Sequence, residues 1–262
     1  MPEARQRKHE RIAADLREMI RSGELRDGDR LPGENGLMQS YGVARMTARQ
    51  ALVALQNEGL AIARKGSGVY VRTFRPVRRL CSRRLSRDVW GAGRSMWEVD
   101  SSTAPVTVDR LIIEKLPATD PVAHLLGIPP GTPIISRRRR YLVDGEPVQL
   151  ATSYIPADLA KGTPIASPDT GPGGIYARLA DIGRAPERFT EELHARMPTA
   201  EEMSALELAS GTPVISMVRT AFDAADTAVE ASDITLSASA YVLQYDFSAQ
   251  PARPADGIRE IK

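Results

Sequence analysis

The chain has 262 residues, of which 42% are apolar and 26% charged. That is the composition of one large or two ordinary globular domains and excludes a disordered chain. No run approaches the roughly 18 consecutive apolar residues of a membrane helix, and residues 1–11 are charged where a signal peptide is apolar. We therefore expect a cytoplasmic protein. A single cysteine, Cys81, and three widely spaced histidines exclude a disulfide framework and favour no metal and no cofactor.

The net charge of +2 hides an asymmetry along the chain. The first 79 residues carry 16 Lys and Arg against 9 Asp and Glu, a net charge of +7, and the remainder carries −5. A basic N-terminal segment is either a solvated surface or a surface that binds nucleic acid. Charge alone leaves both interpretations open.

The first 60 residues predict three helices. Apolar residues at 12, 16, 19 and 20 lie on one face of a helix that begins near Glu10 and ends at Gly23. A turn-rich stretch, 27–32, precedes a short second helix that ends at Gly42. A third helix, 45–57, has its own apolar stripe. Two short helices joined by a tight turn are typical of a helix-turn-helix, and 60–64 and 69–71 predict two strands around a basic, Gly-rich tip, the wing.

The run LPGENGLMQSYGVARMTARQALVALQNEGLAIARKGSGVYV, positions 31–71, resembles the DNA-binding module of GntR-type bacterial transcription regulators. The resemblance implies that the third helix enters the major groove and that the wing tip approaches the backbone. Arginine can pair with guanine there, and Thr47 can bond a phosphate. The implied DNA-binding residues are Glu34, Arg45, Thr47, Arg49 and Gly66, with Lys65 beside the last and Gln50 on the exposed side of the helix.

Three positions weaken this module. Ala44 stands where the family usually has a hydroxyl residue that caps the recognition helix, and a missing cap costs about 0.5–2 kcal/mol. Gly33 replaces a common Ser, and Gly36 inside the second helix costs about 1 kcal/mol.

Residues 72–87 contain seven arginines and Pro76. We interpret 75–88 as a basic linker, which lies either near phosphates or in an exposed hinge. Cys81 lies within it, and a plain thiol is favoured over a redox sensor.

From about residue 90 the pattern predicts an α+β domain with an antiparallel sheet. Strands are expected at 106–113, 134–143, 148–155, 214–222 and 240–247, and helices near 122–126, 175–182 and 200–208. Seven residues recur 80 positions later: Leu126, Gly131, Thr132, Pro133, Ile135, Ser136 and Arg139 return as Leu206, Gly211, Thr212, Pro213, Ile215, Ser216 and Arg219. Two copies indicate a pseudo-symmetric pair of helix-turn-strand units.

The segment GTPIISRRRRYLVDGEPVQLATSYIP and the second GTPVISMVR resemble the effector-binding domain of the HutC subfamily, the UTRA domain, whose fold is related to chorismate lyase. The resemblance implies a small, often anionic, effector. We therefore expect two α+β domains: a winged helix-turn-helix over 1–74 and a UTRA-like effector-binding and dimerisation domain over 89–247. The tail, 248–262, is expected to be disordered.

Within that domain, the family's basic ligand positions fall on Arg139 and Tyr141, and its carboxylate position falls on Ala151. The loss of one cation disfavours a doubly charged sugar phosphate. The candidate effector-binding residues are Arg94, Ser95, Arg139, Tyr141, Thr152, Ser153, Glu230 and Tyr241.

The expected function is a repressor that binds an inverted-repeat operator as a homodimer at the bacterial nucleoid and is released by a small molecule. Two alternatives remain: a regulator whose C-terminal domain only dimerises, and a lyase-like enzyme. The sequence offers no nucleophile–base pair or metal cluster for the enzyme.

Overall fold

The computed structural model describes residues 7–64, 66–72, 76–100, 105–208 and 211–247. Lys65 and the expected tail, 248–262, lie outside these residues. No helix in the described residues is long and apolar enough to cross a membrane.

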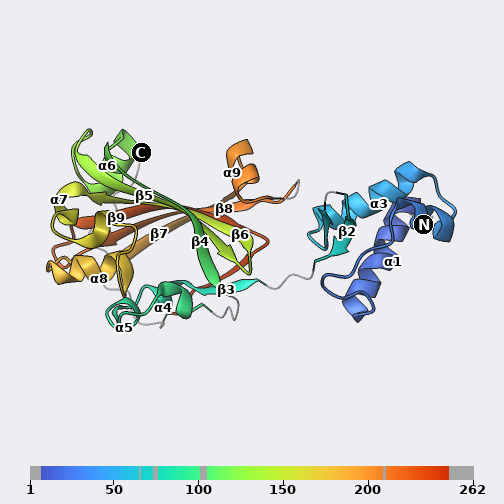
Figure 1. The fold of residues 1–262 in the computed structure, drawn as a ribbon, viewed down its shortest axis with the longest axis horizontal. Helices are drawn as coiled ribbons and strands as arrows, with labels where there is room; N and C mark the ends of the chain where they lie inside the picture. The colour runs from blue at the N-terminus through green and yellow to red at the C-terminus, as the bar shows by residue number, and fades with distance from the viewer. Residues whose placement is uncertain (1–6, 65, 73–75, 101–104, 209–210, 248–262) are drawn as a thin grey trace, which may run out of the picture.

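The N-terminal part consists of three helices and a hairpin (Figure 1). Helices α1 (Lys8–Ser22), α2 (Glu34–Tyr41) and α3 (Arg45–Asn57) are followed by strands β1 (Ala61–Arg64) and β2 (Gly68–Val71), which pair antiparallel. One core unites the helices, with Ile12, Leu16, Leu37, Leu52 and Leu55 buried in it. The expected winged helix-turn-helix is confirmed.

Local backbone chemistry sets the ends of these helices. Gly23 and Gly42 end α1 and α2 in the left-handed region, with φ of 81° and 59°; this conformation favours glycine. The N-cap residues of α2 and α3, Gly33 and Ala44, make no side-chain cap hydrogen bond. The missing caps expected from the sequence are confirmed.

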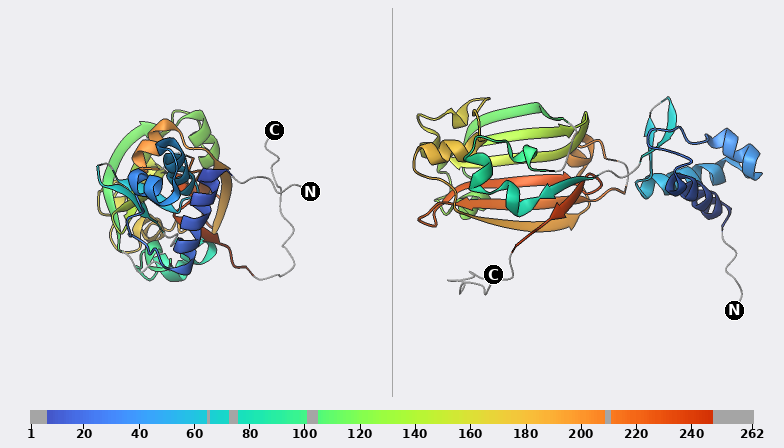
Figure 2. Two further views of the ribbon diagram at one scale, coloured as in Figure 1. Left: turned by 90° about the vertical axis from the view of Figure 1, so that its right-hand side faces the viewer. Right: turned by 90° about the horizontal axis from the view of Figure 1, so that it is seen from below.

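Six strands of the C-terminal part form one antiparallel sheet in the order β4-β5-β6-β9-β8-β7 (Figure 2). The strands are β4 (Val106–Pro117), β5 (Pro133–Val143), β6 (Glu146–Pro156), β7 (Arg188–Arg196), β8 (Val214–Phe222) and β9 (Ala228–Ser237). Strands β7 and β9 were not predicted from the sequence. The echo is confirmed as two helix-turn-strand units, in which α6 (Asp120–Leu126) precedes β5 and α9 (Ala200–Ala205) precedes β8.

Short helices cover the two faces of this sheet. On the face that we call the inner face, Ile155 and Ala221 pack with Trp90 and Leu179 in one core. On the outer face, α6 packs against Ile134 and Ala231. The inner-face elements are α5 (Arg87–Trp90), α7 (Ala157–Ala160) and α8 (Gly174–Asp181), with single turns at Met96–Glu98 and Pro164–Ala166.

The expected linker, 75–88, is corrected from Val77 onward. Strand β3 (Val77–Leu80) pairs parallel with β10 (Tyr241–Gln244), and α4 (Cys81–Arg84) follows. Arg79 and Arg84 are 1% and 2% exposed, so these arginines lie inside the domain and not near phosphates. Cys81 is also buried, and burial raises the pKa of its thiol. Because the thiolate is the reactive form, a raised pKa favours an unreactive cysteine over a redox sensor.

Candidate functional site

The outward side of α3 carries the side chains that the sequence assigns to base reading. Arg45 and Arg49 lie one turn apart, with 63% and 57% of their side chains exposed. Gln50 is exposed beside them and Thr47 is half-buried. Because Ala48 is fully buried on the opposite side, core packing fixes the rotation of the helix and leaves the arginines in solvent.

Glu34, the first residue of α2, contacts both arginines. Its Oε1 accepts a hydrogen bond from Arg49 Nε at 2.7 Å, and its Oε2 lies 3.7 Å from Arg45 Nε. Asn35 Oδ1 accepts a further bond from Arg45 at 3.2 Å. Two long side chains are thereby ordered on the surface of the free protein, which lowers the conformational entropy that they lose on binding.

Two exposed apolar side chains on α3 were not predicted as part of the DNA-binding surface. Met46 is 60% exposed and Val53 is 43% exposed, on the side of the helix away from its core stripe. An apolar side chain in the major groove can contact the methyl group of thymine. The sequence could have indicated their exposure, because both positions lie outside the apolar stripe of the helix.

The wing is held against the body of the N-terminal part by main-chain bonds. Leu31 N donates to Val69 O at 2.8 Å, and Val71 N donates to Asp29 O at 2.8 Å. At the tip, Gly66 has a φ of 73°, a conformation that glycine adopts without strain. The neighbouring Lys65, expected to contact DNA, lies outside the described residues.

A cavity of about 580 Å³ opens on the inner face of the sheet. Its wall combines side chains from β5, β6, β8 and β9 with the loop around Gly93 and the loop 170–174. Six of the eight expected effector-binding residues line it: Arg94, Ser95, Arg139, Tyr141, Ser153 and Glu230.

The other two expected residues lie elsewhere. Thr152 pairs with Arg138 and Asp233 across the sheet, and successive side chains of a strand point to opposite faces. Because Ser153 lines the cavity, Thr152 faces away from it, and its assignment is wrong. Tyr241 lies on β10, buried beside β3, and is not part of the cavity wall.

A chain of hydrogen bonds crosses the cavity floor. Arg139 donates to Ser153 Oγ at 2.5 Å, the hydroxyls of Ser153 and Ser232 are 3.1 Å apart, and Ser232 donates to Glu230 at 2.6 Å. Tyr176 donates to the other oxygen of Glu230 at 2.8 Å. Burial, and then the charge of Glu230, raise the pKa of Tyr176. The floor is therefore a connected polar network that runs from Arg139 to Tyr176.

Three buried arginines in the same wall were not expected there: Arg79 from β3, Arg84 from α4 and Arg219 from β8. Arg84 pairs with Asp100 at 3.0 Å, and Arg219 pairs with Glu191 at 2.8 Å. A signal for Arg219 existed in the sequence, because Arg139 and Arg219 occupy equivalent positions in the two echoed units and both reach the cavity.

The two tryptophans have different surroundings. Trp90 is 1% exposed and packs edge-on against Tyr176, with ring centroids 6.1 Å apart, so it is a core residue. Trp97 lines the cavity, with its ring 4.9 Å from that of Tyr141.

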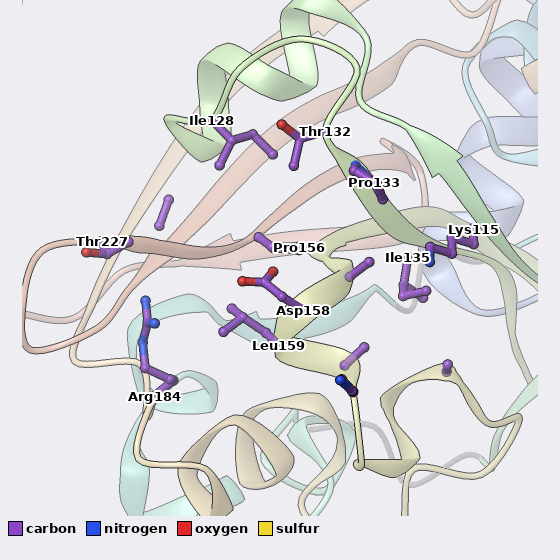
Figure 3. Close-up of a pocket in the computed structure, with 15 residues that line it drawn as sticks. Lys115, Ile128, Thr132, Pro133, Ile135, Pro156, Asp158, Leu159, Arg184 and Thr227 are labelled. Atoms are coloured by element: carbon purple, nitrogen blue, oxygen red, sulfur yellow. The ribbon is translucent and has the colours of Figure 1, made fainter.

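A second hollow, of about 780 Å³, lies beside α7 (Figure 3). Figure 3 shows Lys115, Asp158 and Arg184 around it, among proline and aliphatic side chains. Arg184 is already paired with Asp223 at 2.5 Å. None of the expected effector-binding residues lines this hollow, so the polar cavity is the candidate effector site. Within the described residues no cluster of side chains could hold a metal ion.

Known families match both the N-terminal and the C-terminal part of the chain. The model described as "Bacterial regulatory proteins, gntR family" matches residues 8–71, and that of the UTRA domain matches residues 105–242. An uncharacterised HTH-type transcriptional regulator of Streptomyces coelicolor is 29% identical over 259 residues, 96% of each chain. The HTH-type transcriptional repressor NagR of Bacillus subtilis is 28% identical over 84% of this chain and 86% of its own.

The crystal structure of PhnF from Mycobacterium smegmatis matches 91% of this chain and 100% of its own, with a TM-score of 0.54 and 25% identity. The lyase-like alternative is set aside, because the family and these relatives are regulators. The chain therefore belongs to the GntR family of bacterial regulatory proteins, as a DNA-binding transcription regulator with a C-terminal UTRA domain.

Proposed function

We propose that the protein is a repressor that binds an inverted-repeat operator as a homodimer and leaves it when an effector occupies the inner-face cavity. The observation that carries this proposal is the combination in one chain of two exposed arginines on α3, already ordered by Glu34, and a polar cavity of about 580 Å³. The repressor NagR among the relatives supports the sign of the response. Since the target is chromosomal DNA, we propose that the protein acts in the cytoplasm, at the nucleoid.

The DNA-binding roles follow from side-chain chemistry. Arg45 and Arg49 read guanine in the major groove, since a guanidinium can donate to both O6 and N7. Thr47 and the wing tip around Gly66 contact phosphates, which hold the helix in register. Gln50 reads an adjacent base. Glu34, whose carboxylate engages both arginines in the free protein, acts as a positioning residue.

The apolar surface of β4 supports the homodimer. This strand lies at the edge of the sheet, and Val108, Leu111, Ile112 and Leu116 are 37–49% exposed on it. An apolar edge strand is a surface on which chains associate. We propose that two copies meet there about a twofold axis, so that two recognition helices face two half-sites. Light scattering should give twice the chain mass, and Ile112→Lys should shift it toward the monomer.

Release requires that the effector favour the arrangement that does not bind DNA. The direct test is to select genomic fragments with the full chain, identify the shared repeat, and titrate metabolites into the complex. We expect an inverted repeat and a metabolite that lowers occupancy. A metabolite that tightens DNA binding would reverse the proposed sign of the response. If no metabolite changes DNA binding, the result favours a C-terminal domain that only dimerises.

A further inference from the structure

Three buried arginines gather at the deep end of the inner-face cavity. Arg79, Arg84 and Arg219 are each at most 3% exposed, and all three line the cavity. Arg84 is paired with Asp100, and Arg219 is paired with Glu191. A buried arginine normally has such a carboxylate, because an unpaired charge in the interior is costly.

Arg79 lacks one among the described residues. Its Nη1 donates to the neutral amide of Gln149 at 2.9 Å, and its Nη2 is 3.8 Å from Met217 Sδ, a weak acceptor. Its buried Nε makes no hydrogen bond to any described group. Burial, and then repulsion by Arg84 and Arg219, lower the pKa of Arg79 to about 9. Arg79 is therefore a buried cation of the cavity wall without a directly paired carboxylate among the described residues.

Other donors around this cation are also unused. Within the described part of the chain, the Nε atoms of Arg84 and Arg139, two arginines of the same wall, are buried without a hydrogen-bond partner. One acceptor, Asp100 Oδ2, is also unbonded, but it lies 3.0 Å from Arg84 Nη1 as its ion-pair partner. Buried polar atoms in native proteins are nearly always bonded. An excess of donors over acceptors predicts that a ligand supplies the acceptors.

The charge balance indicates what kind of acceptor fits. The cavity wall carries the carboxylate of Glu230 and five arginines, Arg79, Arg84, Arg94, Arg139 and Arg219, and two further carboxylates, Asp100 and Glu191, pair with Arg84 and Arg219. Positive charge is therefore in excess in this wall, which favours an anionic ligand. The free edge of a guanidinium, Nε with Nη2, matches the two oxygens of a planar carboxylate. A neutral sugar would leave the charge of Arg79 unpaired.

We propose that the effector is an organic acid whose carboxylate binds Arg79; this deepens the proposed function and rests on it. Because Arg79 is 1% exposed, the acid reaches it only when side chains such as Gln149 move. Arg79 belongs to β3, the first strand after the wing strand β2 in the chain. A carboxylate bound there acts on the strand through which the two domains are connected.

The test uses the full chain and a fixed set of probes. Benzoate, phenylacetate, hexanoate and succinate are compared with their amides and with inorganic phosphate by thermal shift and calorimetry, at millimolar concentration and constant ionic strength. We expect at least one acid to raise the melting temperature where its amide and phosphate do not. Arg79→Met should weaken binding of that acid by about tenfold or more, and Arg138→Met, an exposed arginine of the same sheet, should not.

Two matched variants separate ligand binding from a structural role. Arg79→Met removes a charge without a carboxylate partner, so the melting temperature of the free protein should stay near that of the wild type. Arg84→Met removes an equally buried but paired charge and should lower it. If Arg79→Met lowers it as much, or does not fold, Arg79 is structural and the proposal is overturned.

The remaining outcomes are equally decisive. The proposal is overturned if no acid binds, if an amide or phosphate binds as well as the acid, or if Arg79→Met keeps its affinity. A failure of the proposed function would appear in DNA release and not in binding of the acid. An acid that binds through Arg79 but leaves the selected DNA bound would contradict release while supporting the ligand class.

Discussion

The pair between Arg84 and Asp100 makes a quantitative prediction about the C-terminal domain. The two side chains are 2% and 0% exposed, with Nη1 and Oδ2 3.0 Å apart. Arg84→Met leaves the carboxylate buried and uncompensated, which costs about 3–5 kcal/mol when a buried pair is broken. For a domain of this size each kcal/mol lowers the melting temperature by roughly 2–4 °C, so we expect a decrease of about 6–20 °C.

Tryptophan fluorescence is the appropriate assay, because both tryptophans, Trp90 and Trp97, lie in this domain. The matched control is Arg138→Met. Arg138 pairs with Glu114 on the surface, with the side chains 54% and 42% exposed, and such a pair contributes about 0–1 kcal/mol.

Replacing both partners should be far less harmful than replacing one. Burial raises the pKa of Asp100 even though Arg84 and Arg79 lower it, so desolvation opposes much of the attraction within the pair. The variant Arg84→Met with Asp100→Leu should therefore recover most of the stability that Arg84→Met alone loses. A cost of Arg84→Met no larger than that of Arg138→Met, or a double variant as unstable as the sum of its single changes, would refute this reasoning.

Three further predictions concern single side chains. Ala44→Ser supplies the missing cap of α3 and should stabilise the N-terminal domain by about 0.5–2 kcal/mol, measured by circular dichroism; Ala54→Ser, within the helix, should not. Tyr176→Phe removes a buried bond to Glu230 and should cost about 1.5–3 kcal/mol in urea unfolding; a loss below about 0.5 kcal/mol would mean that the bond is not made in solution. Arg196, Thr199 and Thr235 lower the pKa of Glu202 from 4.5 to about 2, so its contribution should be complete above pH 4.5 and disappear as the pH falls toward 2. The stability difference between wild type and Glu202→Gln should shrink over that interval, and a constant difference would contradict this.

The N-terminal domain could be read from the sequence because its signals are local. Apolar spacing gave the helices, glycines marked their ends, and the buried Ala48 fixed which side of α3 faces solvent. Met46 and Val53 were not predicted because the DNA-binding residues expected on α3 were all charged or polar.

The C-terminal domain depends on pairing between distant strands, and the sequence conveys this only in part. The sequence predicted both Thr152 and Ser153 in the effector site, although successive side chains of a strand point to opposite faces, and only Ser153 lines the cavity with Arg139. Strand β7 was missed because charged residues interrupt its apolar pattern along an exposed sheet edge.

The arginines of β3 and α4 were misassigned for a different reason. A run of arginines resembles a solvated linker, and burial of Arg79 and Arg84 becomes possible only through partners that lie far along the chain. Gln149 is 70 residues from Arg79, and no local pattern connects them.

The central claim is that α3 reads DNA sequence through Arg45 and Arg49. The most direct measurement is fluorescence anisotropy of wild type, Arg45→Ala and Arg49→Ala on the selected repeat and on scrambled DNA, at matched salt. Each substitution should weaken binding to the repeat by about 1–3 kcal/mol and change binding to scrambled DNA much less. Equal losses on both DNAs, or no loss on either, would contradict base reading by these two arginines.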